Sequence, residues 1–90
     1  MNTDQRELFR LAVLRVFGSN RTRFGLSVEA IRHLAGLFGF VFPGREETAD
    51  AIDYLARKQL LEEIPKQISP ENRVWRITGP GLAFLDEQGL

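Results

Sequence analysis

The spacing of apolar and polar residues predicts a central helix at the start of the chain. Residues 3–17 carry apolar side chains on more than one side of a helix, a pattern too broad for a surface stripe. Asn2 or Thr3 can cap this helix, and the segment Gly18-Ser19-Asn20 is suited to end it. We therefore expect neighbours on several sides of this helix, followed by a short strand within residues 21–26.

Two further helices are predicted in the middle of the chain. The first begins at Ser27, a good N-cap residue, and ends near Leu37 to Gly39, because glycine weakens a helix. The second covers residues 45–59 and follows Gly44. Its apolar residues recur at helical spacing, which separates an inward face from a mostly acidic outward face. The inward residues are Thr48, Ala51, Ile52 and Leu55, and the outward residues are Glu46, Asp50, Asp53 and Arg57.

After the third helix, the period changes to that of a strand. Two apolar segments separated by a polar loop predict a β-hairpin with a long tip over residues 60–78. In its second strand, Trp75 and Ile77 point to one face and Arg76 to the other. Thr78 then caps a short last helix. The predicted fold class is mainly α with a small β-hairpin, an α+β arrangement with a three-helix core.

Composition narrows the class of protein. Ninety residues suit a single domain over residues 1–90, and an apolar fraction of 43% with 27% charged residues argues against disorder. Cysteine is absent, so neither a disulfide framework nor a thiolate ligand is available. The acidic and basic N-terminal stretch does not look like a secretory signal, and no apolar run is long enough for a membrane-spanning helix. We expect a cytoplasmic protein that does not bind membranes.

Charge is unevenly distributed along the chain, although the net charge is zero. Residues 1–45 contain seven arginines and three acids, whereas residues 46–90 contain five basic residues and nine acids. A nucleic-acid-binding protein usually carries an overall basic balance. Any binding of nucleic acid must therefore depend on a local basic patch.

The order of these elements resembles the winged-helix form of the helix-turn-helix family. The segments "AIDYLARKQLLEEI" and "RVWRITGPGLAFL" look like the end of the third helix, the entry to the wing and the step into a final helix. Small winged-helix proteins of phages and prophages resemble the chain in length and layout. One departure is Gln59, where such domains usually have glycine, and a left-handed glutamine there costs about 1 kcal/mol relative to glycine.

The resemblance implies a small protein that binds double-stranded DNA, as a transcriptional regulator does. Such a protein would place its third helix in the major groove, with bases contacted by Arg45, Thr48 and Ala49. Phosphates would be contacted by Lys66, Arg73 and Arg76 from the wing, and by Arg21, Arg23 and Arg32 from the preceding loop and helix. Acids on the outward face of the third helix oppose this function, because they would be pushed toward the phosphates.

The alternative is a non-catalytic module that binds a protein partner or forms a homodimer. Its contact residues would be Phe40, Phe42, Glu46, Asp50 and Asp53. The two phenylalanines belong to the stretch "GLFGFVFPG", residues 36–44, which we interpret chiefly as a core turn. An exposed aromatic pair there would favour self-association or a protein partner.

An enzyme is not indicated. His33 is the only histidine and lies within a predicted helix. The neighbouring acids Glu46 and Glu47, like Glu62 and Glu63, do not share a helix or strand face, so neither pair forms a catalytic dyad. We expect no catalytic residues, no metal site and no cofactor.

Overall fold

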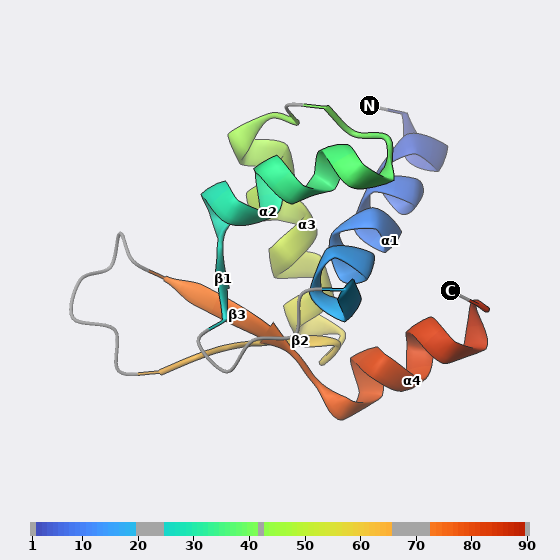
Figure 1. Cartoon of the computed structure of the whole chain (residues 1–90), viewed down its shortest axis with the longest axis vertical. Coiled ribbons are helices and arrows are strands. Elements are labelled where there is room, and N and C mark those ends of the chain that lie inside the picture. Colours follow the sequence, from blue (N-terminus) through green and yellow to red (C-terminus); the bar gives the residue numbers. More distant parts are fainter. Residues whose placement is uncertain (1, 20–24, 42, 66–72, 90) are drawn as a thin grey trace.

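The computed structural model describes residues 2–19, 25–41, 43–65 and 73–89 as a mainly helical chain with a small antiparallel sheet (Figure 1). The elements are α1 (Thr3–Ser19), β1 (Leu26–Ser27), α2 (Val28–Leu34), the 3₁₀ helix η1 (Ala35–Phe38), α3 (Arg45–Arg57), β2 (Leu61–Glu63), β3 (Val74–Ile77) and α4 (Gly79–Glu87). The predicted order of helices and hairpin is confirmed.

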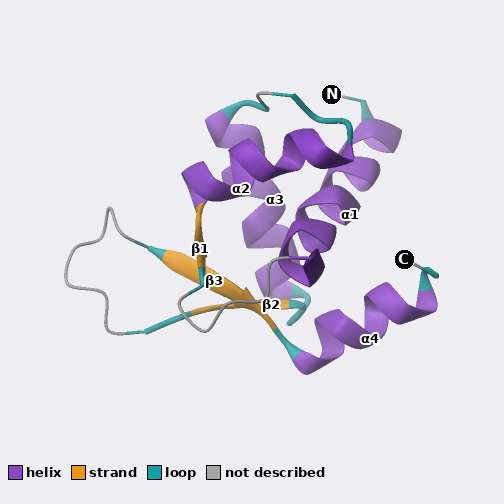
Figure 2. Ribbon diagram, viewed as in Figure 1, coloured by secondary structure: helices purple, strands orange, loops and turns teal. Residues whose placement is uncertain are grey.

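The sheet has three strands in the order β1-β3-β2, and both pairings are antiparallel (Figure 2). In the predicted hairpin, Leu61 lies opposite Ile77 and Glu63 lies opposite Trp75. On the other side of β3, Leu26 of β1 also pairs with Trp75. Trp75 is buried and Arg76 is exposed, which confirms the predicted alternation. The short strand predicted before the second helix thus joins the hairpin as a third strand.

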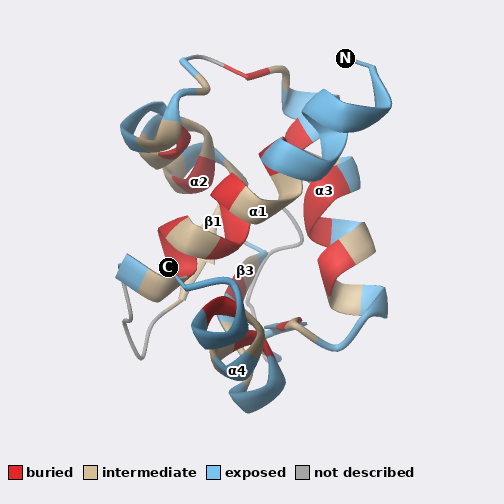
Figure 3. Ribbon diagram, turned by 90° about the vertical axis from the view of Figure 1, so that its right-hand side faces the viewer, coloured by how far each residue is buried: buried red, intermediate tan, exposed pale blue. Residues whose placement is uncertain are grey.

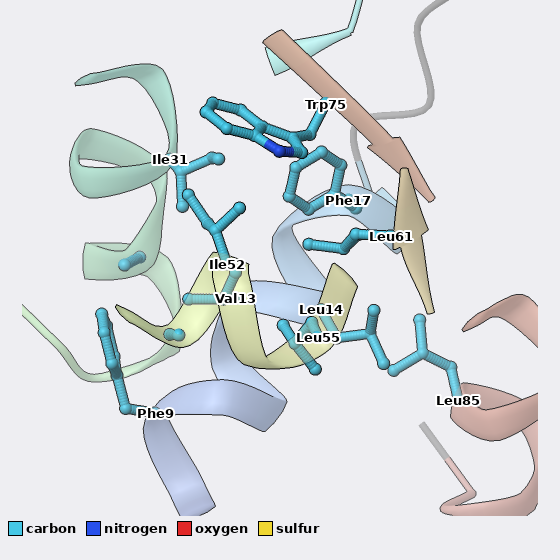
Figure 4. Close-up of a cluster of buried hydrophobic side chains, with 12 residues drawn as sticks. Phe9, Val13, Leu14, Phe17, Ile31, Ile52, Leu55, Leu61, Trp75 and Leu85 are labelled. Carbon is cyan, nitrogen blue, oxygen red and sulfur yellow. The ribbon is translucent and has the colours of Figure 1, made fainter. Parts of the chain in front are cut away.

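The core is built around α1, as the breadth of its apolar pattern predicts. Side chains from all four α-helices, β2 and β3 converge on one cluster (Figure 4). The buried residues of α1 are Phe9, Ala12, Val13, Leu14, Val16 and Phe17. Figure 3 shows that the first turns of α1 and much of α4 are exposed. One apolar residue of α1 departs from the prediction, because Leu8 is 58% exposed.

Side-chain caps start the first two helices. Asn2 Oδ1 accepts a hydrogen bond from the Gln5 amide at 2.8 Å, and Gln5 Oε1 accepts one from the Asn2 amide at 3.1 Å. This reciprocal pair satisfies two N–H groups that a helix start leaves free. Ser27 Oγ accepts from the Ala30 amide at 3.2 Å, so Ser27 is both the end of β1 and the cap of α2.

The described part of the glycine-rich stretch after α2 turns against the core through Phe40, in part as interpreted from the sequence. The 3₁₀ helix η1 ends at Gly39, whose φ of 94° lies in the left-handed region that favours glycine. Phe40 is half-buried, and its ring centroid lies 5.1 Å from that of Phe9. The exposed apolar residues of this segment are instead Leu37 and Val41, each 71% exposed.

The corner between α3 and β2 contains a left-handed glutamine, as predicted. Gln59 has a φ of 64° and is the one non-glycine residue with positive φ in the described part of the chain. Its amide donates to the Ala56 carbonyl at 3.0 Å, and the Leu60 amide donates to the Leu55 carbonyl at 2.9 Å. These two bonds satisfy carbonyls at the end of α3 in the pattern of a Schellman motif.

Replacing Gln59 by glycine should raise the free energy of unfolding by about 1 kcal/mol, because glycine adopts the left-handed conformation without steric cost. The midpoint of urea denaturation measures the change. Lys58→Gly is the matched control. Lys58 has a φ of −84°, so glycine there should lower the free energy of unfolding of the protein. Equal shifts for the two variants would contradict the prediction.

The same corner holds the start of α4. Thr78 Oγ accepts a hydrogen bond from the Gly81 amide at 3.0 Å and donates one to the Gln59 carbonyl at 2.7 Å. The Thr78 amide donates to the Leu60 carbonyl at 3.1 Å. Thr78 therefore caps α4, as predicted, and also ties it to the end of α3.

Candidate binding surfaces

The first candidate surface, the α3 face, comprises the exposed sides of α2, α3 and the hairpin. A shallow cleft of about 250 Å³ lies between the start of α2, α3 and β3. Arg45, Ala49 and Arg73, three of the predicted DNA contacts, line this cleft together with Asp53 and Trp75. The fold thus brings part of the predicted site together.

Arginines on the α2 side of the α3 face share one glutamate. Glu29 lies 3.1 Å from Arg32 Nη1 and 3.3 Å from Arg45 Nε. Arg32 also donates from Nε to the Pro43 carbonyl at 2.9 Å, and only 27% of its side chain is exposed. Arg32 therefore ties α2 to the segment before α3, whereas Arg45, at 74% exposure, remains accessible to a ligand.

The arginines of the hairpin are also paired. Arg73 forms two hydrogen bonds with Glu63, at 2.9 and 3.0 Å, and Arg76 Nε lies 2.6 Å from Glu62. The hydrogen bond from Arg73 lowers the pKa of Glu63, and the same bond raises the pKa of Arg73. A phosphate bound here would compete with a glutamate at each arginine.

Thr48 is a correction to the predicted base contacts. Its side chain is fully buried, and its hydroxyl donates to the Gly44 carbonyl at 2.8 Å. The sequence placed Thr48 on both the inward face and the base-reading face of the helix, and packing against the core selects the inward one. Ala49 is only partly buried and stays in the cleft.

The outward residues of α3 are exposed, as predicted. They are Glu46, Asp50, Asp53 and Arg57. Taken together, α2, α3, β2 and residues 73–77 carry five arginines and seven acids. On these described elements, acids therefore outnumber arginines. Four predicted contacts lie outside the described residues, namely Arg21, Arg23, Phe42 and Lys66.

A second surface is an apolar groove of about 530 Å³ between α1, α3 and α4. We call it the α1–α4 groove, lined by Asp4, Glu7, Leu8, Arg10, Leu11, Leu14, Tyr54, Leu55, Phe84 and Gln88. The Arg10 guanidinium lies 3.7 Å from the centroid of the Tyr54 ring, within cation–π range. In the sequence, the signal for this groove is the large number of apolar residues on α1, because one helix cannot turn every side toward the core.

Other kinds of site are not supported by the part of the chain that the structure covers. Within it, no three His, Cys, Asp or Glu residues gather in a way that could hold a metal ion. His33 is exposed on α2. Of the helices described, none has the length and apolar character needed to cross a membrane.

Comparisons with protein-family models, curated proteins and solved structures gave no match for this chain. The assignment of function therefore depends on the two surfaces described above.

Proposed function

We propose that the chain is a winged-helix domain that acts as a non-catalytic protein-binding module. The order of α1, β1, α2, α3 and the β2–β3 hairpin supports the winged-helix assignment. One observation favours a protein partner over DNA. Each described arginine predicted to contact DNA forms an ion pair with a glutamate of the same face, the four being Arg32, Arg45, Arg73 and Arg76.

The electrostatic reason follows from how DNA is bound. Lysine and arginine gain affinity by neutralising phosphates and releasing condensed counterions. An arginine beside a glutamate adds less to this gain, because the charge of the glutamate opposes the approaching phosphate. In addition, Glu46, Asp50 and Asp53 on the outward side of α3 would approach a polyanion. Acidic side chains around a few exposed arginines are better suited to a protein surface with mixed charge.

The test is a fluorescence anisotropy titration with random-sequence duplex DNA at several salt concentrations. We expect no binding at low salt, because the described α3 face has more acids than arginines. A small basic protein of known fold, titrated into the same DNA, is the positive control for binding. Binding whose affinity falls steeply with salt would contradict the proposal.

Binding of double-stranded DNA is the second candidate. Arg45 favours it, because its side chain is 74% exposed at the start of α3 and lines the same cleft as Arg73. If DNA is bound in this way, Arg45→Ala and Arg76→Ala should each weaken binding and reduce its salt dependence. Arg57→Ala, on an exposed part of α3 outside the cleft, is the matched control.

A further inference from the structure

The α1–α4 groove is long enough along α1 to hold a short helix. One side of the groove follows a stripe of α1 from Asp4 through Leu8 and Leu11 to Leu14. These positions recur every three or four residues, so they share one side of the helix. The stripe is about 15 Å long at 1.5 Å per residue, the length of a helix of about ten residues. Tyr54 of α3 and Phe84 of α4 also line the groove.

The groove is open because α4 is anchored away from much of α1. Thr78 fixes the start of α4 to the end of α3, and Leu85 packs against Gly18 near the end of α1. From the end of β3, α4 extends beneath α1 (Figure 1). The N-terminal half of α1 therefore keeps Leu8 exposed beside Phe84, which is itself only partly buried.

The charges at the groove indicate the kind of occupant. Asp4 and Glu7 are exposed and form no ion pair among residues 2–19, 25–41, 43–65 and 73–89, unlike Glu29. Arg10, the basic residue of the groove, lies over Tyr54. The mouth beside the α1 stripe is consequently acidic. A second copy would not offer a complementary α4, because the charged residues of α4 are Asp86 and Glu87.

We propose that the α1–α4 groove binds an amphipathic helix of another protein, with apolar residues at i, i+3 or i+4 and i+7 and lysine or arginine beside them. Its apolar residues cover Leu8 and Leu11, and its basic residues approach Asp4 and Glu7. This inference rests on the proposed function as a protein-binding module and adds the chemistry of the partner.

The test titrates the isotope-labelled full chain with two synthetic peptides. Both are about ten residues long and carry leucines at the stated spacing, and one has flanking lysines where the other has glutamates. Amide resonances of the protein report where each peptide binds. We expect shifts at Leu8, Leu11 and Phe84 and about tenfold tighter binding of the lysine peptide. The absence of shifts at the groove with the lysine peptide would overturn the proposal.

Two variants distinguish binding in the α1–α4 groove from non-specific hydrophobic binding. Leu8→Glu should weaken binding of the lysine peptide about tenfold or more and should leave the protein folded, because Leu8 is exposed. Leu37→Glu is the apolar control, exposed and outside the groove. Equal affinities for these two variants would overturn the proposal.

A charge reversal tests the acidic mouth. The double variant Asp4→Lys with Glu7→Lys should prefer the glutamate peptide, whereas Glu46→Lys on α3 should keep the wild-type preference. An unchanged preference in the double variant would overturn the charge assignment.

Light scattering provides a separate check, because a wild-type dimer that Leu8→Glu converts to a monomer would identify a second copy as the occupant. The peptide titrations test the groove, whereas the DNA titration tests the proposed function. The two proposals can therefore fail separately.

Discussion

Replacing Phe9 by alanine should lower the free energy of unfolding by about 3–5 kcal/mol, the usual cost of deleting a buried aromatic side chain. Phe9 is 2% exposed, and its ring packs against that of Phe40. The substitution would leave a cavity between α1 and the turn after η1. Chemical denaturation followed by the fluorescence of Trp75, the single tryptophan, measures the change.

Leu8→Ala is the matched control for this prediction. Leu8 precedes Phe9 on α1 but is 58% exposed, so its truncation should change the free energy of unfolding by no more than about 0.5 kcal/mol. Similar losses for the two variants would mean that α1 is rotated about its axis relative to this structure. The comparison therefore also tests the exposure of the α1–α4 groove.

Replacing Gly81 by alanine should lower the free energy of unfolding by about 1–3 kcal/mol, because the added methyl group overlaps fixed backbone. Gly81 is buried in the first turn of α4, and a Cβ there would collide with the Leu60 carbonyl oxygen and lie 2.7 Å from Ile77 Cγ1. The carbonyl cannot move freely, since it accepts the amide of Thr78. Thermal or chemical denaturation measures the loss.

Gly36→Ala is the control for this second prediction. A Cβ at Gly36 would meet no atom within 4 Å, and the residue lies in η1, where alanine is well tolerated. We expect no loss of stability and a gain of up to about 1 kcal/mol. A loss at Gly36 as large as that at Gly81 would show that the effect is a general cost of substituting glycine in this protein rather than a collision at the corner.

Much of the fold follows from short-range signals in the sequence. Ser27 and Thr78 cap the helices for which they were predicted, and Gly39 ends the second helical segment. The left-handed conformation of Gln59 was expected from the resemblance to winged-helix domains, which usually have glycine there, and it is observed. The caps and the glycine at the end of η1 depend on hydrogen bonds or dihedral angles within a few residues, so the local sequence is sufficient to predict them.

The candidate site was predicted only in part, because its charges interact across elements. The sequence marked Arg45 as a base contact and Arg73 and Arg76 as phosphate contacts, but it did not predict that each would meet a glutamate. Arg45 reaches Glu29 on another helix, and Arg73 reaches Glu63 across the hairpin. Such pairs depend on strand register and helix packing, which the identity of each residue alone does not define.

By itself, the sequence determined the order of the helices and strands, the caps of α2 and α4, and which faces of α1, α3 and β3 carry apolar residues. Those properties are set by neighbours along the chain, through periodicity, capping and glycine conformation. Only the tertiary structure decided that Thr48 turns inward, that four arginines of the α3 face pair with glutamates, and that Leu8 remains in an open groove. The physical reason is that each of these outcomes depends on how elements far apart in the sequence pack against one another. An example is α4, whose start is fixed to the end of α3 by Thr78.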